Sequence, residues 1–527
     1  MRLKKNNFLK SSLFVLALVN INFCVKKNYL HNKKSSANRT YYFSANGNDS
    51  NDGSVERPFK SIQKLNSLPL TAGDAVYLYA GDTFDGSILI DSSKFGTNEK
   101  PISIASYGNG MAVINSGNLS ALTIYKTRNI AVSNLKFEGT GRKNGNTKEG
   151  VLIMESKNIT VDNLDISGFQ KSGLLIYSSK FVTNTHVYAH DNGSAGITVE
   201  GSKDKTDSRE IYIGYCRAEN NPGDPTNLTN HSGNGIVVGH CTKVTIEYCE
   251  ATNNGWDMPR IGNGPVGIWG YEADSLIIQH CLSYRNKTSV GGADGGGFDL
   301  DGGVTNSIVQ YCLSYENQGA GYCIFQYWGA SPWYNNVFRY NISKDDGLVS
   351  DAMSGVYVWN SSRDKNQFYN CLFYNNTIYN TKRPAISYSE TSERKNFSFY
   401  NNIFVGEDSL IKGNKGIDIF LANDWWSMTK KFNIERVYDL SQWAKKNKQE
   451  MLNGKVIGLN VKPDFRNPGD TMPTSVLSLK SFNQFNIPGN SPLRNKGIDL
   501  YRLYRIKTGN IDFDQQPAPL KGIGASF

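Results

Sequence analysis

The central part of the chain repeats a short unit that opens on a glycine. The stretches "GLLIYSSKFVTNTHVYAHDN", "GIVVGHCTKVTIEYCEATNN" and "GIWGYEADSLIIQHCLSYRN" begin at Gly173, Gly235 and Gly267. Each reads as a short alternating strand, a turn, a second strand and a polar corner rich in asparagine. Roughly ten such units fill residues 110–410. Because one unit cannot bury its own apolar face, the units must stack in register, and short strands without intervening helices predict a parallel β-helix.

Cysteine and asparagine recur at fixed places in these units. Eight cysteines would ordinarily suggest disulfides in an exported chain, but their spacing predicts a buried stack of small side chains inside the coil. The expected stack contains Cys216, Cys249, Cys281, Cys312 and Cys371. The asparagines of the following corner are expected to form a second ladder, bonded along the axis. These are Asn192, Asn254, Asn286, Asn317 and Asn376.

The beginning of the chain has the composition of an export signal. "MRLKKNNFLK" is basic, and "SSLFVLALVNINFC" is an apolar run too short to cross a bilayer comfortably. We therefore expect a signal peptide or lipoprotein signal at residues 1–24 and a linker at 25–40. Lipid attachment at Cys24 and plain signal cleavage both stay open. The mature protein is expected to be exported without a transmembrane span, and to be periplasmic, secreted or tethered to the outer surface through Cys24.

The regions on either side of the repeats are expected to close the coil. Residues 41–109 read as an N-terminal cap with the first strands, where the amphipathic stretch "PFKSIQKLNSL" predicts a short helix over the open end. Residues 411–527 read as an irregular C-terminal cap with one helix in "DLSQWAKKNKQEML". Net charge is +10 over 527 residues, with the lysines scattered. This excess mildly favours an acidic partner, whereas nothing resembles a nucleic-acid module. We expect a monomer.

The stretch "YYFSANGNDSNDGS", followed by "PFKSIQKL" and the glycine-led units, resembles a known superfamily. It is similar to bacterial secreted right-handed parallel β-helix proteins of the pectate-lyase-like superfamily, which contains polysaccharide lyases and glycoside hydrolases. The resemblance covers roughly residues 41–525. It implies an all-β, right-handed parallel β-helix that acts on a polysaccharide or oligosaccharide, and it is more specific for fold than for reaction.

The stretch "GGGFDLDGG" at residues 295–303 places two carboxyl groups on one strand. Side chains alternate along a strand, so Phe298 and Leu300 should fill the core while Asp299 and Asp301 project outward. Neighbouring coils are about 4.8 Å apart, which should bring an exposed row of aromatic side chains beside the two acids. The expected row contains Trp269, Tyr271, Phe325, Tyr357 and Trp359. Aromatic faces around acids are typical of a sugar-binding groove, unless the C-terminal region packs over them.

Paired carboxyl groups favour glycoside hydrolysis. Two residues along a strand separate Cα atoms by about 6.6 Å, so one aspartate could protonate the glycosidic oxygen while the other activates water or attacks the sugar. Asp294 is a third catalytic candidate. Glu272, His240 and Glu316 from adjacent units are candidates for substrate contacts. Hydrolysis of this kind requires no cofactor.

A calcium-dependent polysaccharide lyase is the alternative. Elimination from a uronic-acid polymer needs a base and a cation that neutralises the substrate carboxylate. Calcium could be held by Asp294, Asp299 and Asp301, with Asp345 and Asp346 as further ligands. Lys287 or Arg285 would be the base. Because neither outer column of the strands contains lysine or arginine, we favour hydrolysis. A third hypothesis is a surface β-helix that binds carbohydrate without catalysis.

Overall fold

The computed structural model describes residues 38–202, 207–350, 352–389 and 393–527. The expected signal at residues 1–24, with Cys24, and the linker up to residue 37 lie outside the described residues. Among the helices in these described residues, none is long and apolar enough to cross a membrane.

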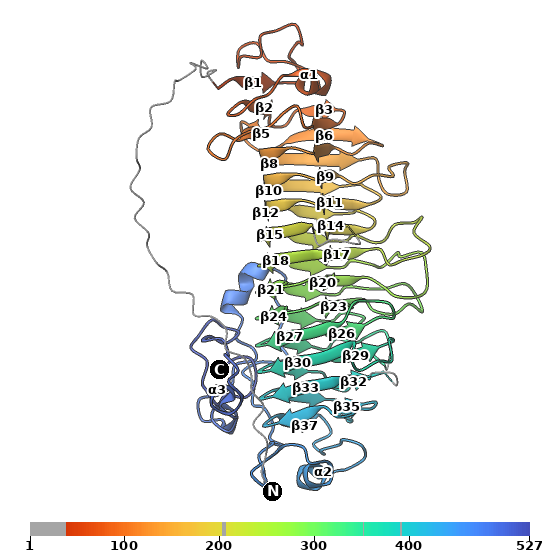
Figure 1. Ribbon diagram of the computed structural model, residues 1–527, viewed down its shortest axis with the longest axis vertical. Helices are drawn as coiled ribbons and strands as arrows, with labels where there is room; N and C mark the ends of the chain where they lie inside the picture. The colour runs from red at the N-terminus through yellow and green to blue at the C-terminus, as the bar shows by residue number, and fades with distance from the viewer. Residues whose placement is uncertain (1–37, 203–206, 351, 390–392) are drawn as a thin grey trace, which may run out of the picture. The chain divides into compact units, whose positions relative to one another are not determined.

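The described chain winds into a parallel β-helix, as Figure 1 shows. One face is a twelve-stranded parallel sheet to which each coil gives one strand. Its strands are β4 (Ile88–Ile90), β7 (Leu122–Tyr125), β9 (Val151–Met154), β11 (Ser172–Tyr177), β14 (Ala195–Glu200), β17 (Asn234–Gly239), β20 (Val266–Tyr271), β23 (Gly296–Leu300), β26 (Tyr322–Gln326), β29 (Val356–Asn360), β32 (Ile386–Tyr388) and β35 (Ile411–Lys412). The stacked coils confirm the predicted all-β parallel β-helix.

The other faces form one 25-stranded sheet within the described residues. Most coils give it two strands, with a corner between them. Its strands are β1 (Thr40–Phe43), β2 (Ala75–Tyr79), β3 (Thr83–Asp85), β5 (Ile102–Tyr107), β6 (Ala112–Gly117), β8 (Arg128–Gly139), β10 (Lys157–Ser167), β12 (Lys180–Thr185), β13 (Tyr188–His190), β15 (Ser208–Gly214), β16 (Arg217–Glu219), β18 (Cys241–Glu247), β19 (Glu250–Thr252), β21 (Ile277–Gln279), β22 (Leu282–Tyr284), β24 (Ile308–Gln310), β25 (Leu313–Tyr315), β27 (Trp333–Arg339), β28 (Ile342–Lys344), β30 (Phe368–Tyr374), β31 (Thr377–Tyr379), β33 (Lys395–Tyr400), β34 (Ile403–Gly406), β36 (Ile419–Leu421) and β37 (Asp424–Ser427).

The inward columns of the twelve-stranded sheet form the core. Ile236 is level with Ile268, and Ile268 with Phe298, in strands that pair in parallel. These side chains are fully buried. Burying each large apolar side chain contributes about 1.5–3 kcal/mol, so the energy that holds one coil comes from the coils above and below it. The alternation that the sequence predicts for "FDLD" is therefore correct for its inward side chains.

The predicted cysteine stack is confirmed for four of its five expected members. Cys216, Cys249, Cys281 and Cys312 are buried free thiols, and the Cys216 N–H donates to the sulfur of Cys249. The fifth assignment is wrong, because Cys371 is level with Asn336 in β27 and β30.

Asparagine replaces cysteine in this column towards the C-terminus. The N–H of Cys312 donates to Asn341, whose amide donates to Asn376. Asn376 therefore belongs to the cysteine column and not to the corner ladder. That ladder begins at Asn192, as predicted, whose backbone N–H donates to Asn221, and it runs through five asparagines before it ends on a carboxyl group. Its links join Asn221 to Asn254, Asn254 to Asn286, Asn286 to Asn317 and Asn317 to Asp346.

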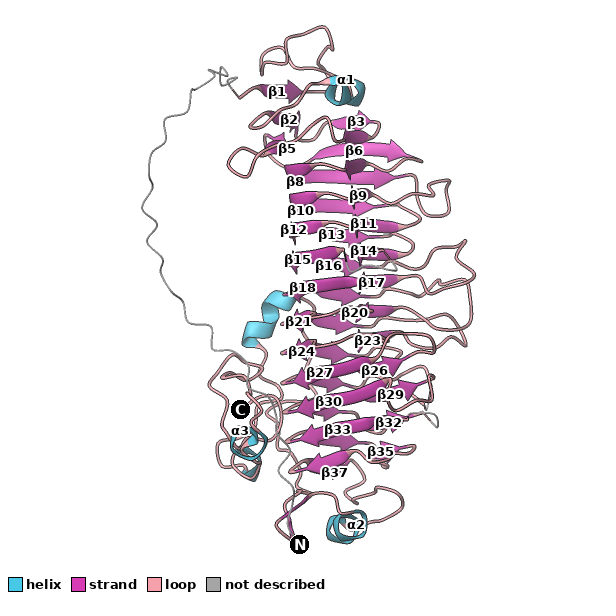
Figure 2. Cartoon of the chain, viewed as in Figure 1, coloured by secondary structure: helices cyan, strands magenta, loops and turns pink. Residues whose placement is uncertain are grey.

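Short helices close the ends of the coil (Figure 2). Helix α1 (Ile62–Ser67) begins after Ser61, whose hydroxyl accepts the N–H of Lys64. It buries Ile62 and Leu65 over the first coils, as predicted. At the other end, α2 (Leu440–Asn447) packs Trp443 against Trp425. The hairpin of β38 (Met451–Leu452) and β39 (Lys455–Val456) follows α2.

The last segment of the chain runs back along one side of the coil. It contains the 3-10 helices η1 (Val476–Ser481) and η2 (Pro492–Arg494) and helix α3 (Leu500–Tyr504). Tyr284 and Tyr315 donate from β22 and β25 to the carbonyls of Thr474 and Pro473. The N–H of Val476 donates to Glu250. The segment therefore covers the side that carries β19, β22 and β25.

Candidate active site

The strand register places the two aspartates beside the expected neighbours. Asp299 in β23 is level with Trp269 in β20 and with Cys323 in β26, and Cys323 is level with Tyr357 in β29. Asp301 follows β23 directly, and its N–H donates to the carbonyl of Gly270. The sequence therefore predicted the outward column and its order along the coil correctly.

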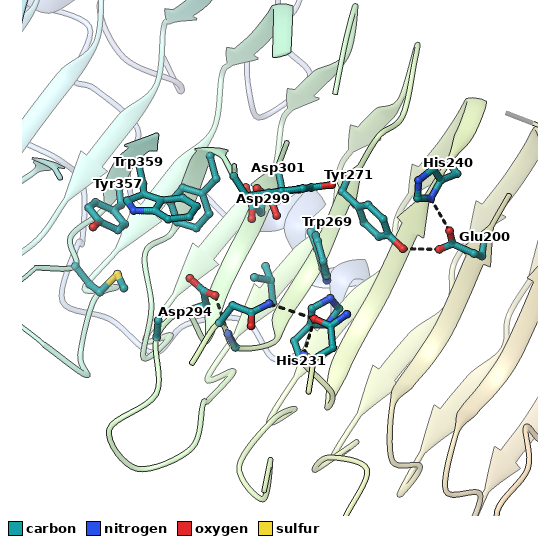
Figure 3. Close-up of a pocket in the computed structure, with 18 residues that line it drawn as sticks. Glu200, His231, His240, Trp269, Tyr271, Asp294, Asp299, Asp301, Tyr357 and Trp359 are labelled. Atoms are coloured by element: carbon teal, nitrogen blue, oxygen red, sulfur yellow. Dashed lines mark hydrogen bonds and ion pairs between the residues drawn. The ribbon is translucent and has the colours of Figure 1, made fainter. Parts of the chain in front are cut away.

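A pocket with a volume of about 640 Å³ is lined by Trp269, Asp299, Asp301 and Tyr357, whereas Cys323 is not part of the lining. Figure 3 shows Asp299 and Asp301 between Tyr357 and Trp359 on one side and Trp269 and Tyr271 on the other. The structure brings together nine of the side chains that the sequence singled out. They are His240, Trp269, Tyr271, Asp294, Asp299, Asp301, Phe325, Tyr357 and Trp359.

Loops between coils turn the expected open groove into a pocket. Residues 230–231, 263–264 and 293–294 come from three successive loops that lead into β17, β20 and β23, and Met353 comes from the loop before β29. Because of this cover, Asp299 is only 2% exposed and Trp269 only 4%. None of the described residues after Trp359 lines the pocket. The C-terminal segment therefore covers a different side of the coil.

Six candidate site residues named from the sequence do not line the pocket. They are Glu272, Arg285, Lys287, Glu316, Asp345 and Asp346. Glu272 accepts the N–H of Ser331 beside the turn at Gly303. Glu316 pairs with Arg285 at 2.8 Å. Lys287 holds its corner through a backbone bond to Asn254, and its side chain is not part of the lining.

The pocket also contains residues that the sequence reasoning did not select. Glu200 stands in the same outward column as Tyr271, so the alternation of β14 carried the signal for it. His231, Tyr327 and Met353 lie on loops, where no periodicity marks which way a side chain points. The missed lining residues with functional groups are Glu200, Asn230, His231, Asn263, Tyr327 and Met353.

The three aspartates differ in how their charge is stabilised. Burial, with the nearby charges of Asp301 and Asp294, holds the pKa of Asp299 well above its ordinary value. Oδ1 of Asp299 is buried without a hydrogen-bond donor among the described residues. Burial raises the pKa of Asp301 to about 7 against the effect of the Gly302 N–H, which donates to it over 2.7 Å. Burial also raises the pKa of Asp294 to about 6, opposed by the N–H of Gly264 at 2.8 Å.

Glu200 anchors a polar network at one end of the pocket. Its carboxylate accepts from the hydroxyl of Tyr271 at 2.6 Å and is bonded to Nδ1 of His240 at 2.7 Å. Burial and the charge of Glu200 raise the pKa of Tyr271, so its phenol keeps its proton and acts as a donor. Gly239 lies between the two in β17, where a Cβ would come within 2.3 Å of the Tyr271 ring. Glycine at 239 therefore lets the ring reach Glu200.

The arrangement of the acids does not match a calcium site. Calcium prefers six to eight oxygen ligands around one point. Among the side chains that the structure describes, no group of three or more His, Cys, Asp or Glu is arranged to hold a metal ion. Asp345 instead accepts the N–H and the hydroxyl of Thr381. Asp346 accepts from the last amide of the corner ladder.

The chain resembles known proteins in sequence and in fold. A family model described as "Pel9A-like, right handed beta helix region" matches residues 41–351. The protein "Uncharacterized protein YwoF" of Bacillus subtilis (strain 168) is 28% identical over 156 residues, and the chain spans 28% of that protein and uses 30% of its own length.

Two solved structures have a similar path of the chain. A GH136 lacto-N-biosidase from Eubacterium ramulus is 18% identical, with a TM-score of 0.47 over 72% of this chain and 67% of that one. The pectate lyase Pel9A is 14% identical, with a TM-score of 0.43 over 93% of this chain and 97% of that one. At these values the likeness carries no information on reaction or substrate.

Proposed function

Because the chain belongs to the Pel9A-like right-handed β-helix family, we propose that it is a carbohydrate-active enzyme and that it hydrolyses a glycosidic bond through Asp299 and Asp301. One observation carries this proposal. Two neighbouring carboxyl groups, that of the buried Asp299 and that of the half-buried Asp301, differ in hydrogen bonding at the centre of a pocket with aromatic walls.

The unequal hydrogen bonding assigns the two roles. Asp299 has a pKa well above its ordinary value and no donor to Oδ1, so it holds a proton at neutral pH. It acts as the general acid and gives this proton to the glycosidic oxygen as the bond to the anomeric carbon breaks. Asp301 is the more readily ionised, since the Gly302 N–H stabilises its charge. It removes a proton from the attacking water or attacks the anomeric carbon itself.

The aromatic side chains would supply the binding energy for sugar rings. Trp269 and Tyr271 stand on one side of the acids, and Tyr357 and Trp359 on the other. Phe325 meets Tyr357 and Trp359 edge to face, at centroid distances of 5.5 and 5.7 Å, and this packing fixes that wall. Apolar ring faces bury well against sugar faces, while the few polar groups orient the substrate.

Two features favour hydrolysis over elimination. The described pocket lining contains no lysine or arginine to serve as a base, and Lys287 lies outside it. The aspartates also lack the grouping that a calcium ion needs. The proposed reaction uses no metal ion, whereas the lyase alternative depends on calcium.

We also propose that the enzyme works outside the cytoplasm as a monomer. The basic and apolar residues at 1–24 support export. Mass spectrometry of the mature N-terminus distinguishes cleavage by a signal peptidase from lipid attachment at Cys24.

A substrate screen tests the proposed reaction. The purified protein is incubated with neutral and acidic plant and algal polysaccharides, with and without a chelator. New reducing ends without ultraviolet absorbance of an unsaturated uronate, unaffected by the chelator, are expected. Asp299→Asn and Asp301→Asn should abolish the signal, whereas Asp346→Asn, a buried control in the corner ladder, should keep it. A chelator-sensitive ultraviolet signal would replace this proposal by the lyase.

A further inference from the structure

The pocket is lined by four acidic residues and by no lysine or arginine of the described chain. Glu200, Asp294, Asp299 and Asp301 line it, and every lining residue lies in the described part of the chain. None of them is lysine or arginine. A uronate carboxylate would enter against these groups, and like charges brought together in a desolvated site cost several kcal/mol. The overall charge of +10 suggests an acidic glycan, but the pocket itself is unsuited to one.

One basic side chain, that of Arg260, binds a residue of the pocket lining. Arg260 lies outside the lining and donates to the carbonyl of Asn263 at 3.1 Å. Its charge reaches His231, where it acts with burial to lower the pKa. Arg260 is therefore a basic group close enough to affect His231, and its substitution tests for a uronate in the pocket.

A second observation concerns the proton on His231. Oδ1 of Asn234 accepts from the N–H of Val266 at 3.3 Å and from Nε1–H of Trp269 at 3.0 Å. Neither donor can accept, so they fix the orientation of the Asn234 amide. Its Nδ2 then donates to the carbonyl of Ser194 at 3.2 Å and to Nδ1 of His231 at 3.0 Å.

This chain of bonds leaves one protonation state for the imidazole. Nδ1 accepts a hydrogen bond, so the proton is on Nε2. Burial, assisted by Arg260, lowers the pKa of His231 to about 4, and the ring is neutral at neutral pH. Trp269 meets the ring edge to face at 4.9 Å and holds its plane. Nε2 has no partner among the described side chains, and His231 lines the pocket.

We propose that the pocket takes an uncharged sugar residue and that His231 is a specificity-determining residue, whose Nε2–H donates to a hydroxyl or carbonyl oxygen of that sugar. This inference rests on the hydrolase activity proposed above and names the substrate class of the same site. A neutral donor binds a neutral oxygen acceptor without the charge that an imidazolium would place beside the catalytic acids.

The protonation state can be measured without a substrate. The intact protein carries six histidines, so isotope-labelled histidine and a His231→Gln variant identify the signal of His231 by NMR. We expect a neutral Nε2–H form from about pH 5 to pH 8. Asn234→Asp gives Nδ1 a carboxylate partner and should move the titration up into this range, whereas Asn253→Asp, outside the pocket, should not. A wild-type His231 that titrates near its ordinary pKa, or carries its proton on Nδ1, would overturn the inference.

Kinetics on matched oligosaccharides tests the substrate class. For a neutral and a uronic oligosaccharide of the same linkage, we expect hydrolysis of the neutral one. His231→Gln should raise KM about tenfold with a smaller effect on kcat, as the loss of one hydrogen bond predicts, and Arg260→Gln should leave KM unchanged.

The outcomes separate the two claims. Hydrolysis of the uronic substrate, weakened by Arg260→Gln, would overturn the uncharged class and leave the hydrolase intact. An unsaturated product would overturn the hydrolase itself. If neither oligosaccharide is cut, the NMR signal of His231 is followed while each is added, and a response to the uronic one alone would contradict the inference.

Discussion

The hydroxyl of Tyr271 lies 2.6 Å from a carboxylate oxygen of Glu200, although strand β17 separates their two strands in the sheet. We expect Tyr271→Phe to lose this bond to a charged acceptor, which costs about 1.5–3 kcal/mol. Gly239→Ala should have a similar effect, because its Cβ would displace the ring. Thermal midpoints test this against Tyr79→Phe, an exposed tyrosine of β2. Equal midpoints for all three variants would mean that the network contributes nothing.

Asp346 ends a ladder that elsewhere consists of asparagine. Burial raises its pKa to about 7, so the folded state favours the protonated acid. That contribution is complete below the unfolded pKa of about 4 and is lost as pH rises through about 7. Asp346→Asn avoids the loss and can donate to Ser343, which now donates to the acid. We expect the variant to be more stable than the wild type at pH 8 by on the order of 3 kcal/mol, with a much smaller gain at pH 4. A variant that is less stable at pH 8 would contradict this reasoning.

Asparagine variants of the two catalytic aspartates should also be more stable than the wild type at pH 8, but they should lose activity. Asp299 and Asp301 both have raised pKa values for the same reason, burial. Asparagine at either site removes a carboxyl group that resists ionisation. We expect Asp299→Asn and Asp301→Asn to unfold at a higher temperature at pH 8 while kcat falls by about 10²–10⁴. Loss of both activity and stability would instead indicate a structural role.

Activity should depend on pH through the pair as a unit. Hydrolysis needs one carboxyl group ionised and the other protonated, so kcat/KM should be bell-shaped, with an acidic limb near the pKa of about 7 of Asp301. The charge of Asp294 raises the pKa of both acids. Asp294→Asn therefore lowers both pKa values and should move both limbs to lower pH. Limbs that stay in place would show that Asp294 is not coupled to the pair.

The outward column could be predicted from sequence because it depends on one local rule. Side chains alternate along a strand, and the glycine that opens each unit fixes where the alternation starts. Trp269, Asp299 and Tyr357 consequently fall on one face in the predicted order. The apolar partners Phe298 and Leu300 leave the strand only one way to face the core.

One error arose because a cysteine at a different place in its unit was assigned to the column. "CLFYNNTIYN" contains the letters expected of the cysteine unit, but Cys371 lies inside β30, whereas Cys249 follows the end of β18 by two residues. Asn376, two residues after β30, occupies the column instead. The pocket walls were missed for a different reason. Asn230, His231 and Met353 lie on loops whose path depends on contacts between coils, and no periodicity in the sequence marks them.

The origin of the oxygen at each new reducing end distinguishes hydrolysis from elimination. The glycan identified by the screen is cleaved in water enriched with heavy oxygen, and products are weighed before the anomeric oxygen exchanges. Hydrolysis by Asp299 and Asp301 predicts one labelled oxygen at each new reducing end, in the wild type and in Asp346→Asn but in neither catalytic variant. Unlabelled, unsaturated products would contradict it and make the enzyme a lyase.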